Sequence, residues 1–275
     1  MTTSTSLPSA HEVSSGFVNS RPFEWLARSG FVARGLVYGV IGVLALKLAV
    51  GSGGKTTNQQ GAMRTIAQQQ FGKVLLLLLS LGLAGYAMWR LTRAALGRGP
   101  EGSDTAIDRI AALGSGLVYG SLCVVAIEIL TGSATGKTGN PKATTAGVLG
   151  WPAGTLLVGL AGVVLIGVGA YQGYRGLTRK FLDDSKTEEM GPETERWIAR
   201  IGTVGHVARM VIFGLAGGFL IKAAVDYNPR AAIGLDGALA KLQHQTYGHL
   251  LLGVVAAGLI AFALYSISDA RYRRI

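Results

Sequence analysis

Residues 33–39 read Ala-Arg-Gly-Leu-Val-Tyr-Gly and open an apolar run that continues to residue 50. The core of this stretch returns as Gly-Leu-Val-Tyr-Gly at residues 116–120, and a third version, Ala-Arg-Met-Val-Ile-Phe-Gly, occupies residues 208–214. Each version again opens an apolar run. Because about 20 apolar residues suffice to cross a bilayer as a helix, the repeated stretch predicts three equivalent membrane helices.

A second apolar run follows each of these openings. Its centre reads Gly-Leu-Ala-Gly-Tyr at residues 82–86, and this pattern returns at residues 167–171 and 258–262. Each repeat of roughly 80 to 90 residues therefore holds two spans, and the copies run parallel to one another. The six predicted spans cover residues 31–50, 74–94, 111–131, 155–173, 207–225 and 250–267.

These spans predict an all-α integral membrane protein in which three tandem two-helix repeats form a pseudo-threefold bundle. The expected parts are a disordered cytoplasmic tail, three membrane repeats, and a solvated acidic linker between the second and third repeats. Their boundaries are residues 1–24 for the tail, 25–100, 107–182 and 197–275 for the repeats, and 183–196 for the linker.

The composition favours the same class of protein. Charged residues make up 15% of the chain, against about 25% in soluble domains. The net charge of +11 comes from basic residues that flank the apolar runs, which favours anionic headgroups over nucleic acid as the partner. Of the 17 arginines, 15 fall on the side of the N-terminus, so both termini are expected in the cytoplasm of a bacterial cell, below its plasma membrane.

Three motifs together resemble the bacterial membrane family catalogued as domain of unknown function 1206. They are the Ala-Arg-Gly-Leu-Val-Tyr-Gly opening, the Gly-Ala-Met and Phe-Gly element at residues 61–63 and 71–72, and Gly-Leu-Ala-Gly-Tyr. The resemblance implies three tandem two-helix units between Trp25 and Arg273. The middle copy departs most, since Ser115 replaces the opening arginine. The family carries no established activity, so no catalytic residues follow from it.

Charged residues inside apolar spans are the first candidates for a site, because burying a charge in lipid is costly. Lys47, Glu128 and Lys222 share one position near the outer end of the first helix in each repeat. Around a common axis they would form a charged constriction or an ion-relay site. Alternatively, both lysines extend to the outer headgroups and Glu128 pairs locally.

A second candidate set lies near the inner face. Arg34 is followed four residues later by Tyr38, Arg209 is followed by Phe213, and Tyr119 holds the aromatic place in the middle repeat. These residues suit an anionic lipid or a phosphate-containing ligand held between helices. Ordinary anchoring at the positively charged inner face is the alternative.

Other polar residues predict less. His244 and His249 are five residues apart, whereas helical metal pairs use three or four, so we expect no metal site. His206 is expected to be solvated or interfacial. No catalytic motif and no cofactor motif stands out, and we therefore do not expect an enzyme. Two outer stretches, residues 60–70 and 231–245, are expected to form amphipathic helices on the outer surface.

The leading functional hypothesis is a membrane protein with an interhelical site for a small ligand, a lipid or an ion, in a channel-like or transporter-like role. The alternative is a structural or assembly protein that docks other membrane subunits. The expected partners are the lipid bilayer, anionic lipids at the cytoplasmic face and, under the alternative, a membrane protein.

Overall fold

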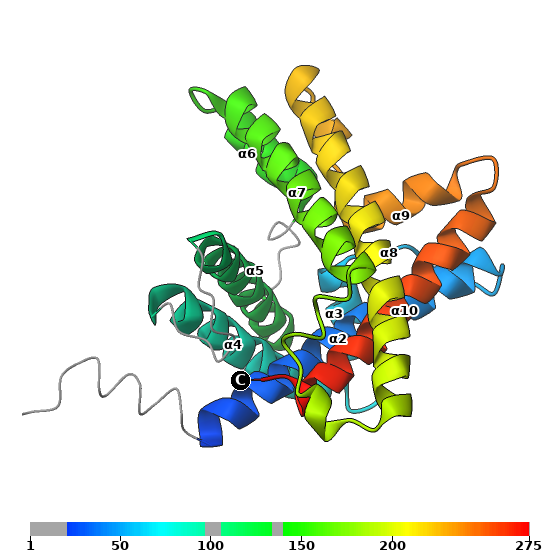
Figure 1. Ribbon diagram of the computed structural model, residues 1–275. Helices are drawn as coiled ribbons and strands as arrows, with labels where there is room; N and C mark the ends of the chain where they lie inside the picture. The colour runs from blue at the N-terminus through cyan, green and yellow to red at the C-terminus, as the bar shows by residue number, and fades with distance from the viewer. Residues whose placement is uncertain (1–20, 97–105, 134–139, 275) are drawn as a thin grey trace, which may run out of the picture.

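The computed structural model describes residues 21–96, 106–133 and 140–274, and six long helices run through them (Figure 1). Each is long and apolar enough to cross a membrane, which confirms the six predicted spans. Most of the predicted tail lies outside the described residues. The long helices are α2 (Arg21–Ala49), α4 (Gly72–Leu96), α5 (Ala106–Thr131), α7 (Gly154–Leu177), α8 (Pro192–Val225) and α10 (Gly248–Tyr272).

The first and last of these helices pack antiparallel. Arg28 at the start of α2 donates from Nη1 to the carbonyl oxygen of Arg271 at 2.7 Å. At the other end, Nδ1 of His249 lies 3.1 Å from the carbonyl oxygen of Ala49. We call the end at which α2 begins and α10 finishes the terminal end of the bundle.

A short helix follows the first long helix of each repeat. These helices are α3 (Gln59–Ala67), α6 (Pro141–Leu149) and α9 (Leu235–Gln243), with two 3₁₀ turns, η1 (Thr187–Glu189) and η2 (Pro229–Ala231), elsewhere in the chain. The Asn58 side chain caps α3 by accepting from the Gly61 amide at 3.0 Å, which satisfies one of the free N–H groups of the first turn.

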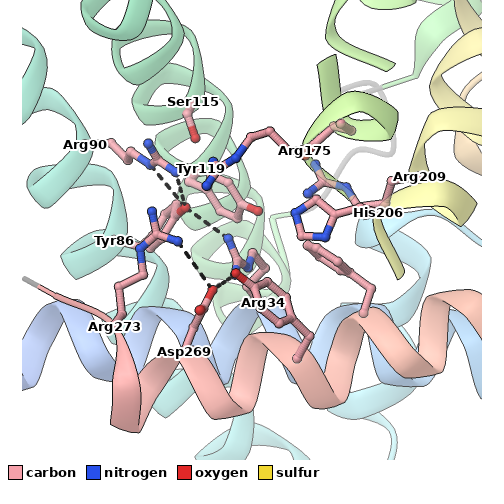
Figure 2. Close-up of a pocket in the computed structure, with 13 residues that line it drawn as sticks. Arg34, Tyr86, Arg90, Ser115, Tyr119, Arg175, His206, Arg209, Asp269 and Arg273 are labelled. Atoms are coloured by element: carbon pink, nitrogen blue, oxygen red, sulfur yellow. Dashed lines mark hydrogen bonds and ion pairs between the residues drawn. The ribbon is translucent and has the colours of Figure 1, made fainter. Parts of the chain in front are cut away.

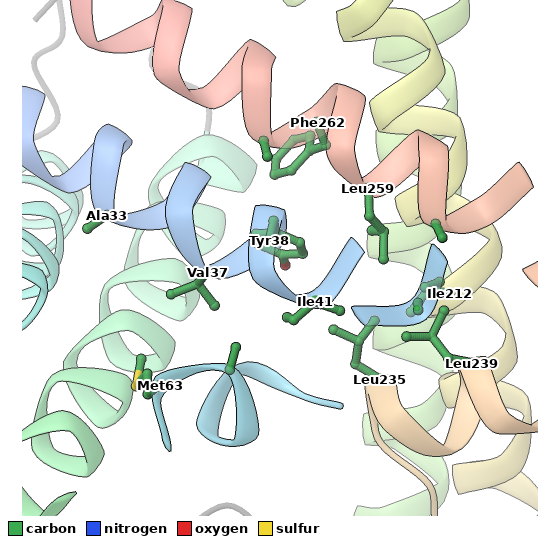
Figure 3. Packing of buried hydrophobic residues seen from close by; sticks show 14 of the residues in the cluster. Ala33, Val37, Tyr38, Ile41, Met63, Ile212, Leu235, Leu239, Leu259 and Phe262 are labelled. Atoms are coloured by element: carbon green, nitrogen blue, oxygen red, sulfur yellow. The ribbon is translucent and has the colours of Figure 1, made fainter. Parts of the chain in front are cut away.

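The prediction of helices near residues 60–70 and 231–245 is confirmed, and their place on the outer surface of the membrane stays a prediction. Met63 of α3 and Leu239 of α9 are fully buried. They pack in one cluster with Val37 and Ile41 of α2 (Figure 3). The apolar side of each short helix is covered by long helices, so it needs no lipid to cover it.

The long helices are joined in a fixed order. The second helix of each repeat packs against the first helix of the next, in the pairs α4 with α5, α7 with α8, and α10 with α2. Within repeats, α2 packs on α4 and α8 packs on α10, but α5 and α7 form no comparable interface in the described residues (Figure 1). The interface between repeats therefore occurs three times, but the interface within a repeat occurs only twice among the described residues. Because the middle repeat differs, the pseudo-threefold arrangement stays a prediction.

The outer repeats have a glycine at a helix contact where the middle repeat has an alanine. A methyl group on Gly205 of α8 would lie 2.7 Å from Cβ of Phe262, and a methyl group on Gly30 of α2 would overlap Tyr86 in the same way. Counting from the repeated opening, the equivalent residue of the middle repeat is Ala111. Small residues at such positions allow helices to approach closely in membranes, and the Cβ of Ala111 disfavours the same approach.

The segment between α7 and α8 is buried just before the predicted linker, and within residues 183–196 every residue except Ser185 is exposed or half-buried. Phe181 is fully buried, and its ring stacks on His206 with centroids 4.9 Å apart. The Lys186 amide donates to the carbonyl oxygen of Tyr272 at 2.7 Å and fastens the segment to the end of α10. The prediction that His206 is solvated or interfacial is wrong, since the ring is buried among Phe181, Phe262 and Tyr265.

Candidate anion-binding cavity

A cavity of about 90 Å³ lies between the long helices toward the terminal end (Figure 2). All six long helices contribute side chains to its lining, and its volume accommodates a few water molecules or one small ion. It is partly open rather than sealed. Its charged lining comprises one carboxylate, Asp269, and five arginines, namely Arg34, Arg90, Arg175, Arg209 and Arg273.

Arg34 is held rigidly at one side of the cavity. Its Nη2 donates to Asp269 at 2.9 Å, its Nε donates to the Ser266 hydroxyl at 2.9 Å, and its Nη1 donates to the Tyr86 hydroxyl at 3.1 Å. The guanidinium also lies 5.1 Å from the ring centre of Phe31, which favours the cation. The guanidinium of Arg34, a residue of α2, is therefore fixed by three partners that lie on α4 and α10.

Arg175 and Arg273 meet at Asp184, in the loop after α7. The Asp184 carboxylate accepts from Arg273 at 2.7 Å and also from Arg175. Nη1 of Arg273 also lies 3.8 Å from Oδ2 of Asp269. The Asp184 carboxylate therefore connects the end of α7 to the end of α10 and holds two guanidinium groups beside the cavity.

Arg209 stands on the opposite side from Arg34. Its guanidinium lies 4.4 Å from the ring centre of Phe262 and 5.5 Å from that of Tyr38. With the Gln172 amide turned so that its oxygen faces Arg209, this oxygen accepts from Nη1 at 2.9 Å and Nη2 at 3.1 Å. The buried Nε of Arg209 has no hydrogen-bond partner, although such a group normally has one.

Donors outnumber acceptors in this lining. The Tyr86 hydroxyl oxygen accepts from Arg90 at 3.0 and 3.1 Å in addition to Arg34, so two cations share one neutral acceptor. Guanidinium groups carry five N–H donors and no acceptor, and they match the oxygens of phosphate or carboxylate. The arrangement can hold a small oxyanion, which would relieve the repulsion among the arginines.

The structure brings together most of one predicted set. Arg34, Arg209 and Tyr119, which the sequence suggested for an anionic lipid or phosphate, line the cavity. Tyr38 is buried and faces the Arg209 guanidinium. Ser115 lines the cavity too, so all three equivalent opening positions of the repeats reach it.

The other predicted set does not reach the cavity lining. Lys47 and Lys222 are exposed and Glu128 is half-buried. Lys222 donates to Asp226, which directly follows the last residue of α8, at 2.7 Å. Ion binding by these three residues stays a prediction, and the polar cavity of the described chain lies elsewhere.

Sequence reasoning missed Asp269, Arg90, Arg175 and Arg273 as site residues. The arginines resemble the other basic residues at the inner ends of the spans, and no local signal separates them. Asp269 did carry a signal, because it is an acidic residue at the end of a strongly apolar helix. The predicted span ended at residue 267 and left it out.

The six apolar helices and the repeated units define a multi-pass, all-helical membrane protein. The chain belongs to the family described as Domain of Unknown Function (DUF1206), whose model matches residues 29–97, 110–179 and 204–273. This confirms the resemblance and the three tandem repeats. The chain is also similar to Uncharacterized protein YxxB of Bacillus subtilis (strain 168), with 32% identity over 250 residues that cover 90% of each protein. No solved structure matches the chain.

Proposed function

We propose that this protein is a non-enzymatic membrane protein that binds a phosphate-type oxyanion in the cavity between its helices. The observation that carries the proposal is that five guanidinium groups and one carboxylate line the same cavity. Arg34 and Arg273 are buried and the other three arginines are half-buried. Placing charges inside a membrane bundle is costly, and residues of this kind usually mark a ligand or ion pathway. The cavity suits a transporter-like or receptor-like role.

The chemistry of the lining favours binding over catalysis. Arginine stays protonated in proteins and does not exchange protons near neutral pH. A lining dominated by such groups holds a negative charge in place rather than moving protons during a reaction. The unpartnered Nε of Arg209 supplies a donor for an anion at the side opposite Arg34.

Phosphate binding can be measured on the purified protein in detergent. We expect inorganic phosphate to raise the thermal unfolding midpoint at constant ionic strength, because a ligand that binds only the folded state stabilises it. Arg209→Gln removes one charged donor and is expected to weaken binding by roughly 10- to 100-fold, since hydrogen bonds to charged groups contribute about 1.5–3 kcal/mol.

The matched control is Arg200→Gln. Arg200 lies on the same helix, is exposed and packs beside Trp197 away from the cavity. The control loses the same charge and is expected to bind phosphate normally. The proposal fails if phosphate gives no more stabilisation than chloride, or if the two variants bind phosphate equally.

We also propose that the terminal end faces the cytoplasm and that the membrane is the bacterial plasma membrane. The support is the arginine distribution, 15 of 17 on the side of the termini. Reporter fusions at the two ends of the chain should both report a cytoplasmic position. A periplasmic signal from either end would contradict this orientation.

A docking role in a larger membrane assembly is the second candidate. The observation that favours it is the apolar surface of α5 and α7, whose apolar stretches are 22% buried against 33–50% in the other long helices. Purification in a mild detergent should then return a stoichiometric membrane partner. A protein that elutes alone and still binds phosphate would exclude this role.

A further inference from the structure

The two helices of the middle repeat leave open a face that the outer repeats close. Val118 of α5 is 57% exposed, whereas its equivalent in the first repeat, Val37, is 2% exposed. Tyr171 of α7 is 49% exposed, and its equivalent Tyr86 is 1% exposed. The residues that pack within the first and third repeats therefore face outward in the middle one. We call this face between α5 and α7 the seam.

The seam leads into the cavity. Ser115 and Tyr119 of α5 line the cavity from one side of the seam, and Gln172 and Arg175 of α7 line it from the other. Residues spaced by three or four positions share a helix face, so Val168 continues the face of Gln172 and Arg175 away from the terminal end. Leu157, Val164 and Val168 on this part of α7 are all exposed. An apolar strip thus runs from the bilayer to the basic cavity.

We infer that the ligand of the cavity is an anionic phospholipid that enters sideways through the seam, a conclusion that rests on the proposed oxyanion binding. Its phosphate would occupy the arginine-lined cavity and its acyl chains would lie along the apolar strip. Basic pockets between membrane helices on the cytoplasmic side are typical sites for anionic headgroups. A free phosphate would explain the arginines but leaves the exposed strip without a role.

The depth of the cavity fits this occupant. Helix α5 spans 26 residues, or about 39 Å, which exceeds the ~30 Å hydrocarbon core. Ser115 lies six residues beyond Arg109, about 9 Å deeper along the helix. Arg175 lies two residues before the end of α7. The cavity therefore extends from the headgroup level into the core, as a phosphate with attached chains requires.

The test compares lipid retained by the intact protein after reconstitution in nanodiscs and detergent exchange. Nanodiscs of phosphatidylglycerol and of phosphatidylcholine serve as the two probes, and native mass spectrometry counts the bound lipid. We expect phosphatidylglycerol to be retained roughly tenfold more than phosphatidylcholine, because only its headgroup carries a net negative charge. Equal retention of the two lipids overturns the inference.

Val168→Trp places a large ring in the seam, and Val163→Trp is the matched control. Both valines are exposed on α7. They are five residues apart in the sequence and therefore point about 140° apart around the helix axis, onto different faces. Val168→Trp should lower phosphatidylglycerol retention severalfold, while Val163→Trp leaves it unchanged. Both variants should keep the thermal stabilisation by inorganic phosphate in detergent, which shows that the cavity remains folded.

The outcomes separate the two proposals. If inorganic phosphate stabilises the protein but Val168→Trp does not affect lipid retention, the lateral lipid route is wrong and the cavity binds a free anion. If neither phosphate nor phosphatidylglycerol binds, the proposed function itself fails. Recovery of a stoichiometric protein helix in place of lipid would also overturn the inference.

Discussion

The buried ion pair between Arg34 and Asp269 makes the sharpest stability prediction. The Arg34 side chain is 7% exposed and the Asp269 side chain 2% exposed, and Nη2 and Oδ2 are 2.9 Å apart. Removing one partner of such a pair leaves an uncompensated charge in a poorly solvated site, at a typical cost of about 3–5 kcal/mol. Asp269→Asn should fall near the lower limit, about 3 kcal/mol, because Arg34 keeps Ser266 and Tyr86 as acceptors.

The control for this prediction is Asp226→Asn. Its carboxylate also accepts from a cation, Lys222, at 2.7 Å, but the two side chains are 41% and 59% exposed. Exposed pairs contribute about 0–1 kcal/mol. The free energies of unfolding of both variants would be measured by denaturation with sodium dodecyl sulfate in mixed micelles. A loss of stability in Asp269→Asn no larger than that in Asp226→Asn would refute the argument from burial.

Asp269→Asn is expected to lower the stability of the protein but to raise its affinity for phosphate. The substitution removes the one carboxylate that lines the cavity, while the five arginines remain. The potential in the cavity becomes more positive, so phosphate should bind more tightly and stabilise the variant more than the natural protein. Weaker phosphate binding with the fold intact would mean that Asp269 positions Arg34 for the ligand rather than opposing it.

Two further predictions concern packing. Gly205→Ala should destabilise the protein by about 1–3 kcal/mol, because its new methyl group meets Phe262. The control, Gly214→Ala, places a methyl group with nothing within 4 Å and should not destabilise the protein. The same unfolding assay measures both variants, and equal effects would contradict the packing argument. Phe181→Ala should cost about 3–5 kcal/mol, since it removes a fully buried ring that stacks on His206. A change below 1 kcal/mol would show that the loop after α7 is not part of the folded core in the membrane.

The sequence alone determined the class of protein, the six spans and the three units. Apolar length is a local property, and the repeated Gly-Leu-Val-Tyr-Gly opening is visible wherever it occurs. It also placed Arg34 and Arg209 at one position of the repeat and Tyr119 at the aromatic position that follows it. That relation suggested an anion site and left ordinary anchoring at the inner face as the alternative.

The tertiary structure decided which charges meet. Asp269 and Arg34 are 235 residues apart, and nothing local links them. Arg90 and Arg175 reach the cavity because of how their helices are rotated and packed, whereas Arg200, equally basic, remains exposed on the surface. The separation of α5 from α7 is likewise a matter of tertiary packing, and Ala111 stands where both outer repeats have a glycine in close helix contact. Hydropathy fixes which segments enter the membrane, but side-chain shape at the interfaces fixes which faces meet within it.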